Sequence, residues 1–261
     1  MITLDKNREY VKNYNAISSD VKFVSNSLIR LKVLKALYEK PLNMKDLATS
    51  TKLSYSSISS TLHRLELKDM VFRKSNKYHL ENLLKLQMKN ILELTCVVNL
   101  LEDIFNIVQG HVIDKIPEQS IEELHLLGEA ILLESNGVEV DKIYNFIEDV
   151  LVQANSARCV LPIYHEVFNF RLNDLILEGK FVEILASKSV YEVYNKNSTA
   201  KYLSSFDGEN NFLLIITNEI MVFGLFRNNG VFDQNRLVIS RSRDSIKWAN
   251  NLFRYFKKEN K

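Results

Sequence analysis

The sequence predicts a two-domain protein of the α+β or α/β class, in which a small helical domain ending in a hairpin is joined by a long helix to a layered α/β sheet domain. Three observations predict this. Apolar residues recur at helical spacing in the first third of the chain, one long apolar helix pattern follows, and short apolar strands then alternate with helices. A length of 261 residues also suits two domains. The expected parts are residues 1–80, 81–110 and 111–261.

Composition is that of an ordinary globular protein, 46% hydrophobic and 25% charged. No apolar run approaches the roughly 18 residues that a membrane helix needs, and the polar N-terminus shows no secretory signal. Cys96 and Cys159 are isolated in the sequence. We therefore expect a cytoplasmic protein with free, buried thiols and no membrane partner.

Charge is divided unevenly along the chain. Residues 1–80 hold 15 Lys plus Arg against 7 Asp plus Glu, a net charge of +8, which leaves −6 for the remainder. Such a split favours one module that meets phosphates and one that does not. All seven glycines lie at Gly110 or later, so the front has no glycine-rich phosphate loop.

Three helices are expected in the front module. The first covers residues 20–39 and is ended by Pro41. Asn43 can cap a second helix as far as about residue 51, and Ser54 can cap a third as far as about residue 68. The apolar face of the first helix is formed by Leu28, Ile29, Leu31, Val33, Leu34 and Leu37.

The third helix has a split composition. Ile58, Leu62 and Leu65 recur at helical spacing and anchor it to the core, while hydroxyl side chains occupy most other positions. Short hydroxyl groups let a helix sit deep in a major groove and bond to phosphates or base edges; the alternative is a solvated serine face. The predicted DNA contacts on this helix are Ser54, Tyr55, Ser56, Ser57, Ser59, Ser60, Thr61 and Arg64.

An alternating basic segment follows directly. Residues 70–80 suit a two-stranded hairpin with Asn76 at its turn and Arg73, Lys74 and Lys77 around it. The basic residues of such a wing contact the phosphates of the DNA backbone beside the groove. An ordinary exposed hairpin could carry three basic residues too, but its place after the third helix favours the wing.

Residues 27–80 resemble archaeal and bacterial winged helix-turn-helix regulators, whose pattern "S.S..HL.RLE..GLV" stands here as LSYSSISSTLHRLELKDMV. The resemblance implies duplex DNA as the partner. Asp69 replaces the glycine that usually ends the helix. Aspartate can enter the left-handed region, so we expect the turn to survive.

The recurrence of apolar residues over residues 81–109 predicts one long helix. Its near-heptad apolar stripe comprises Leu84, Met88, Ile91, Val98, Leu101, Phe105 and Val108, with Thr95 as a polar member. A helix with so many apolar residues must be covered on two sides. Its own domain can cover one side, and the same helix of a second chain can cover the other. Its length favours contact with the same helix of a second chain, as in regulators that bind half-sites as homodimers, over a purely intradomain role.

The back module alternates strands and helices. Strands are expected at residues 130–134, 158–163, 181–186, 211–216 and 220–226, and helices at 138–153, 166–178, 189–196 and 244–258. This half resembles the C-terminal domain of archaeal methanogenesis regulatory proteins, through stretches such as IPEQSIEELHLLGEAILLES, KFVEILASKSVYEVY and SRDSIKWANNLFRYF. The resemblance implies a transcriptional regulator with an effector-sensing domain. By analogy, the layout is also similar to a phospholipase D-like half-fold, without that enzyme's HxK signature after His165.

No catalytic, metal or cofactor constellation is visible. The five histidines are scattered, and neither HExxH nor CxxC occurs. Because ligands of α/β sheets bind at the carboxyl ends of strands, we expect an effector pocket there; the alternative for its histidine is local capping or packing. The expected lining is Pro162, Tyr164, His165, Ser187 and Thr217.

The leading hypothesis is a cytoplasmic, homodimeric, DNA-binding transcriptional regulator, not an enzyme, whose back domain senses a small-molecule effector or a partner. Two alternatives stay open. An enzyme of unknown class in the α/β half lacks any catalytic motif. A winged-helix interaction module without DNA binding conflicts with the +8 charge of the front.

Overall fold

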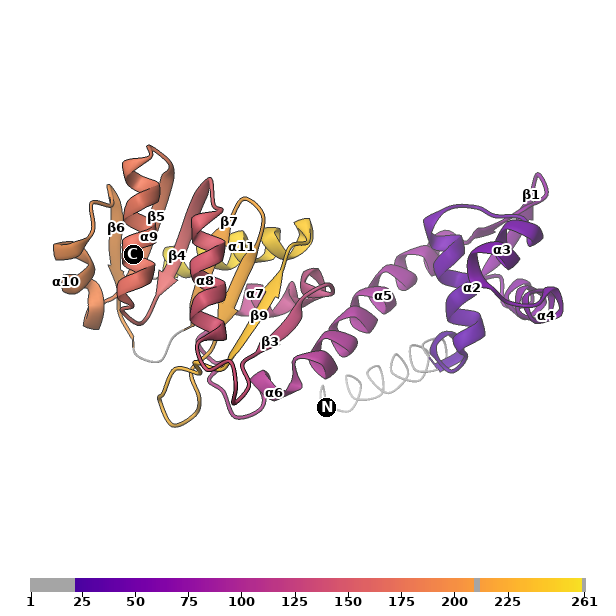
Figure 1. The fold of residues 1–261 in the computed structure, drawn as a ribbon. Coiled ribbons are helices and arrows are strands. Elements are labelled where there is room, and N and C mark those ends of the chain that lie inside the picture. Colours follow the sequence, from indigo (N-terminus) through magenta and orange to yellow (C-terminus); the bar gives the residue numbers. More distant parts are fainter. Residues whose placement is uncertain (1–21, 209–211, 260–261) are drawn as a thin grey trace, which may run out of the picture. The chain divides into compact units, whose positions relative to one another are not determined.

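The computed structural model describes residues 22–208 and 212–259 (Figure 1). The chain divides into two compact units, a front unit, Met1–Thr95, and a back unit, Cys96–Lys261. Each unit has its own buried core. A mixture of helices with one large mixed sheet confirms the predicted fold class at this level.

The front unit places three helices beside a hairpin. These elements are α2 (Leu28–Glu39), α3 (Met44–Thr51), α4 (Tyr55–Glu66), β1 (Val71–Lys74) and β2 (Lys77–Leu80). Side chains of Asn43 and Ser54 accept hydrogen bonds from the third residue of α3 and α4, as their capping roles predict. Asp69 adopts a φ of 52°, so the expected left-handed turn at this aspartate is confirmed.

The first predicted helix is interrupted. Residues 22–25 are helical, but α2 begins anew at Leu28, because the Ser27 side chain caps it by accepting from the backbone N–H of Arg30. The predicted apolar face of this helix is wrong at two positions, because Leu28 is 69% exposed and Ile29 is 38% exposed. The core is formed by side chains of α2, α3, α4 and the hairpin, together with Leu84 and Met88 of the next helix.

The linking segment forms two helices, α5 (Asn82–Asp103) and α6 (Phe105–Val108), rather than one. In the first half of the predicted stripe, Leu84 and Met88 are buried in the front core, so the chain's own front unit covers this part of the helix. The apolar side chains of α5 that are exposed include Val98 and Leu101 of the predicted stripe, together with Leu83, Leu86 and Leu94. These positions recur at helical spacing and share one face of the helix.

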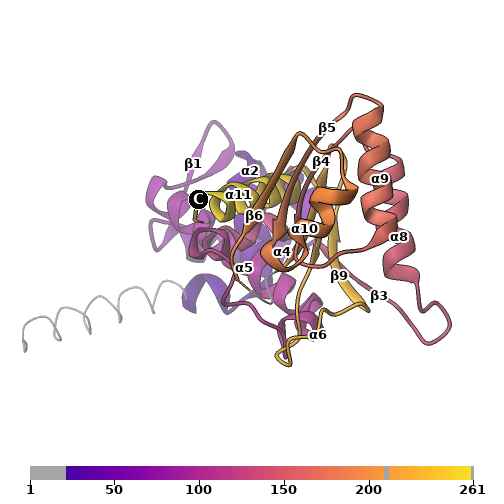
Figure 2. The same ribbon diagram turned by 90° about the vertical axis from the view of Figure 1, so that its left-hand side faces the viewer.

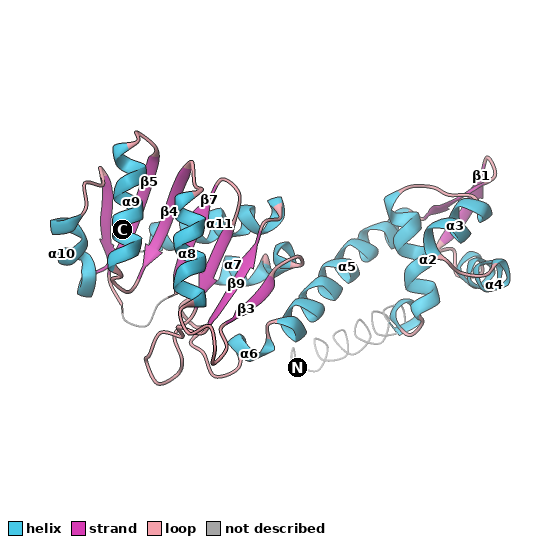
Figure 3. Cartoon of the chain, in the orientation of Figure 1, coloured by secondary structure: helices cyan, strands magenta, loops and turns pink. Residues whose placement is uncertain are grey.

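A seven-stranded mixed sheet forms the centre of the back unit, in the order β3-β9-β8-β7-β4-β5-β6 (Figure 3). The strands β4, β5 and β6 are parallel, whereas β7, β8, β9 and β3 continue the sheet antiparallel. Their bounds are β3 Ile131–Glu134, β4 Ser156–Leu161, β5 Phe181–Ser187, β6 Tyr202–Phe206, β7 Leu213–Thr217, β8 Met221–Gly224 and β9 Arg236–Ser240.

Helices cover both faces of this sheet (Figure 2). Alternate strand residues pack on α8, α9 and α10 on one face, and on α11, the 3-10 helix η1 and the end of the linking segment on the other. Strands β7 and β8 are therefore buried on both faces. The helices are α7 Glu118–Glu122, η1 Leu124–Leu127, α8 Lys142–Val152, α9 Glu166–Leu177, α10 Lys188–Asn197 and α11 Arg243–Glu259.

Two strands were not predicted. β6 lies at the sheet edge and alternates exposed with half-buried residues before Phe206, so it lacks a continuous apolar run. β9 follows a long loop and has only three consecutive apolar residues. One thiol expectation also fails, because Cys96 is exposed, whereas Cys159 is buried.

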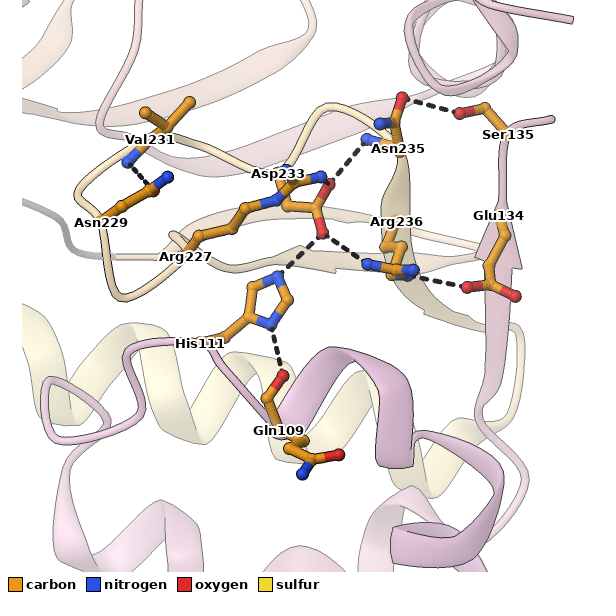
Figure 4. A network of polar contacts seen from close by, with 10 residues as sticks. All are labelled: Gln109, His111, Glu134, Ser135, Arg227, Asn229, Val231, Asp233, Asn235 and Arg236. Carbon is orange, nitrogen blue, oxygen red and sulfur yellow. Dashed lines mark hydrogen bonds and ion pairs between the residues drawn. The ribbon is translucent and has the colours of Figure 1, made fainter. Parts of the chain in front are cut away.

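A buried carboxylate fixes the segment that follows the linking helices (Figure 4). Asp233 is fully buried, and its Oδ2 atom lies 2.8 Å from Nε2 of His111 and 3.3 Å from a guanidinium nitrogen of Arg236. Its Oδ1 atom accepts from Arg227 at 2.8 Å and from the backbone N–H of Asn235 at 3.1 Å. The carboxylate thus accepts four donors.

The same network extends to the sheet. Arg236 also binds Glu134, its cross-strand neighbour on β3, at 2.7 Å. Burial alone would raise the pKa of Asp233, but hydrogen bonds from Arg227 and His111 outweigh it and hold that pKa below its usual value. The polar cluster therefore ties His111, which follows the linking helices, to the β8–β9 connection.

Candidate functional site

The exposed face of α4 carries most of the predicted DNA contacts. Ile58, Leu62 and Leu65 are buried in the front core, as predicted. Ser56, Ser60 and Arg64 are exposed and lie four residues apart, so they share the face that turns away from this core. Short hydroxyl side chains along this face leave room for a nucleic-acid groove.

The first serines of α4 have a second role. The Ser54 hydroxyl accepts from the backbone N–H of Ser57 at 3.2 Å and lies within hydrogen-bond distance of the hydroxyls of Ser56 and Ser57. Ser54 is thus engaged as a helix cap. Ser57 and Thr61 are half-buried, whereas Tyr55 and Ser59 are exposed on the flank of the helix.

The hairpin that follows α4 displays its basic residues at the tip. Ser75 and Asn76 both have positive φ, 49° and 61°, which is the conformation of a tight two-residue turn whose twist matches the strands. Lys74 and Lys77 are direct cross-strand partners. Arg73 donates to the Asn76 carboxamide, and all three cations are exposed.

Positive charge in this part of the front unit is uncompensated. Residues 22–80 contain 12 Lys plus Arg and 4 Asp plus Glu. Among these described residues no Lys or Arg lies within ion-pair distance of a carboxylate; along the chain the first described pair is Lys89–Glu93. By contrast, cations of the back unit pair closely, as in Arg171–Glu148 at 2.7 Å and Lys188–Asp207 at 2.6 Å. A surface of unpaired cations is suited to a polyanion.

The sequence did not single out Arg30, which belongs to the same charged region. It is only 9% exposed, and its guanidinium stacks 3.8 Å from the ring centroid of Phe23, with Lys68 near the same ring. Its Nε atom has no hydrogen-bond partner. Burial first, and then the neighbouring charge of Arg64, lower the pKa of Arg30. The available signal was an arginine within an apolar helical run.

Four of the five predicted effector residues are brought together in the back unit. The Ser187 hydroxyl donates to the carbonyl of Pro162 at 3.2 Å. Tyr164 packs edge-on against Tyr194, and His165 precedes the first residue of α9. These residues gather at the carboxyl ends of β4 and β5, as expected.

His165 is held among aromatic rings. Its ring stacks on Tyr144 at 4.5 Å between centroids and lies 4.3 Å from Phe168. Burial lowers the pKa of His165, although Glu148 and Glu166 oppose the shift. Its Nδ1 atom is buried without a hydrogen-bond partner. Packing against Tyr144 and Phe168 therefore explains the position of the His165 ring, and its Nδ1 atom is left without a hydrogen bond.

The placement predicted for Thr217 is wrong. β7 runs antiparallel to β4, so Thr217 pairs with Ala157 at the start of β4, whereas Leu161 and Ala186 mark the carboxyl ends. Thr217 therefore lies at the opposite edge of the sheet. Its hydroxyl accepts from the backbone N–H groups of Glu219 and Ile220 and stabilises the β7–β8 turn.

The described part of the chain contains neither a metal-binding cluster nor a membrane-spanning helix. Among residues 22–208 and 212–259 there is no group of three or more His, Cys, Asp or Glu side chains placed to hold a metal ion. No helix in these ranges is both long enough and apolar enough to cross a membrane.

Comparison with known families returns two matches, which lie on either side of residues 100–139. Residues 18–99 match the model of the N-terminal domain of methanogenesis regulatory protein FilR1, and residues 140–259 match the model of its middle domain. Together they account for more than half of the chain. Methanogenesis regulatory protein FilR1 of Methanothrix harundinacea (strain 6Ac) is 24% identical over 250 residues. That alignment covers 90% of this chain and 56% of the relative, so the chain spans little more than half of the relative's length.

Solved structures are similar only at a low level. TrmBL2, an archaeal chromatin protein, is 13% identical with a TM-score of 0.38, covering 92% of this chain and 96% of that one. An O-methyltransferase of Nostoc punctiforme is 14% identical with a TM-score of 0.26, covering 76% and 64%. Superpositions at these scores support no conclusion about function.

Proposed function

Because the chain belongs to the family of methanogenesis regulatory protein FilR1 through its N-terminal and middle domains, we propose that it is a transcriptional regulator that binds duplex DNA with its front unit. In this proposal the front unit acts as a winged helix-turn-helix. α4 enters the major groove, and the β1–β2 hairpin lies on the sugar-phosphate backbone.

The observation that carries the proposal is the unpaired positive charge around α4 and the hairpin. Ser56, Ser60 and Arg64 would meet base edges and phosphates in the groove. Lys74 and Lys77, paired across the hairpin, would meet phosphates beside it. Arg30 and Lys68 add cations near Arg64 that no described carboxylate neutralises.

We expect the purified 261-residue chain to bind mixed-sequence duplex DNA with an affinity that depends steeply on the salt concentration. With about six phosphate contacts, affinity should fall roughly 1000-fold between 50 and 200 mM salt. Fluorescence anisotropy of a labelled 30-base-pair duplex measures this. Absence of binding at 50 mM salt would refute the proposed DNA contact.

The exposed stripe on α5 supports a homodimer in the same proposal. Leu83, Leu86 and Leu94 are 69%, 68% and 60% exposed, which is unusual for leucines grouped on one helical face. A second copy of the helix would bury this stripe against its own equivalent, in a symmetric contact. Two front units would then reach two half-sites.

Leu94→Glu should disrupt this dimer, because the symmetric contact would bury two unpaired carboxylates. We expect dissociation of the dimer to become about 100-fold more favourable, as measured by sedimentation equilibrium. Asn99→Glu is the matched control, since Asn99 is exposed on the same helix but lies off the stripe. Equal effects of both variants, or a wild-type monomer at micromolar concentration, would contradict the proposed contact.

The back unit is proposed to sense a small-molecule effector or a partner. Pro162, Tyr164, His165 and Ser187 support this as a group at two strand ends, with one unused imidazole nitrogen. The similarity of this domain to a phospholipase D-like half-fold stays a prediction that the present comparisons do not support.

A further inference from the structure

A wholly apolar cavity lies in the back unit, on the sheet face opposite His165. Its volume is about 110 Å³. Its walls come from α5 and α6, from the segment that includes α7 and η1, from β8 and β9, and from α11. No charged or hydrogen-bonding side chain lines it apart from Trp248, whose indole N–H already donates to the Ser120 carbonyl at 2.8 Å.

The cavity is partly open to solvent. Among the lining residues, Leu101, Ile113 and Ile121 are 37%, 43% and 44% exposed and border the opening, whereas Ile107 and Leu127 are buried. Voids larger than a water molecule are few in a well-packed interior. The apolar lining offers no hydrogen-bond partner to a water molecule, and an ordered water needs two to four such partners.

From this geometry we propose that the cavity binds a small, neutral, apolar molecule. The volume of the cavity limits the size of the bound molecule, because an apolar cavity of about 150 Å³ binds benzene or xenon. A volume of 110 Å³ therefore suits a compact hydrocarbon group of about five carbon atoms. It is too small for a helix or a peptide segment. The lining also excludes ions, which would lose hydration without gaining a hydrogen bond.

The position of the cavity gives binding a structural consequence. Leu101 belongs to the end of α5, Ile104 lies between α5 and α6, and Ile107 and Val108 belong to α6. One wall is therefore the segment that follows the front unit in the chain. The opposite wall is the sheet. A bound molecule would contact both walls. It would therefore stabilise the arrangement of the linking segment on the sheet in which the cavity encloses it most completely. Any effect on DNA rests on the proposed function, whereas binding itself does not.

Binding can be tested without DNA, in the 261-residue chain carrying isotope-labelled isoleucine methyl groups. Xenon and cyclopentane are the probes. We expect saturable shifts of the methyl resonances of Ile107, Ile113 and Ile121, while Ile143 and Ile147, on the other sheet face, stay unchanged. No saturable shift with either probe would overturn the proposal, and would leave DNA binding unaffected.

Val108→Phe should abolish these shifts by filling the cavity, at unchanged or higher melting temperature. Val190→Phe is the matched control, because Val190 is also half-buried but packs on the opposite face. Should Val108→Phe not fold, Ile113→Phe narrows the exposed mouth instead. Shifts that persist in the filled variants would overturn the proposal.

Discussion

Replacing Asp233 with alanine is expected to lower the free energy of unfolding of the back unit by about 3 kcal/mol. The carboxylate is fully buried and accepts four hydrogen bonds, so its loss leaves His111 buried without its partner. Arg227 and Arg236 are partly exposed and can turn to solvent, which limits the loss. Urea unfolding followed by the fluorescence of Trp248 measures it, because this is the only tryptophan of the chain and lies in the back core.

Asp207→Ala is the matched control for this prediction. Asp207 also pairs with a cation, Lys188 at 2.6 Å, but both side chains are exposed. Such a pair contributes little to stability, so we expect a change within about 0.5 kcal/mol. Similar losses in both variants would show that the buried position of Asp233 does not matter.

The contribution of Asp233 should also depend on pH. Because its pKa in the folded protein is below the usual value, the carboxylate stabilises the fold above the unfolded pKa of about 3.9, and this contribution is lost as the pH falls through the folded pKa. The stability difference between wild type and Asp233→Ala should therefore shrink below about pH 4. A difference that grows on acidification would contradict the sign of this shift.

Local features of the front unit were predictable from the sequence. Each of these features depends on residues that are close together in the sequence. They are the caps at Asn43 and Ser54, the buried face of α4 and the left-handed turn at Asp69. The break before α2 depends on one capping serine, Ser27, inside an otherwise helical pattern, so periodicity alone did not show it.

Long-range pairing in the back unit could not be predicted in the same way. The apolar run of β7 suits a parallel or an antiparallel strand equally, yet the antiparallel pairing with β4 moves Thr217 to the other edge of the sheet. His111 and Asp233 are 122 residues apart, and nothing near either one in the sequence indicates the contact. The cavity beside α6 arises from five separate segments and has no sequence pattern of its own.

Neutralising the hairpin by Arg73→Ala, Lys74→Ala and Lys77→Ala together should weaken DNA binding about 100-fold at 0.1 M salt, on the proposed function. If each cation meets one phosphate, the slope of log affinity against log salt concentration becomes shallower by about 2.7. Loss should be similar for all sequences, because phosphate contacts carry no base information. Anisotropy titrations at four salt concentrations, on two unrelated duplexes, measure both quantities.

A matched triple variant separates contact from net charge. Lys115→Ala, Lys188→Ala and Arg241→Ala remove the same charge from exposed back-unit side chains, which are 47%, 64% and 60% exposed. If the hairpin touches the backbone, this control keeps the wild-type salt slope, since release of counterions requires neutralised phosphates. Arg64→Ala, on the groove-facing side of α4, should instead change which duplexes are preferred in a selection of bound fragments. An equal loss in both triple variants would show that only overall charge attracts DNA, and the hairpin would then have no role as a wing.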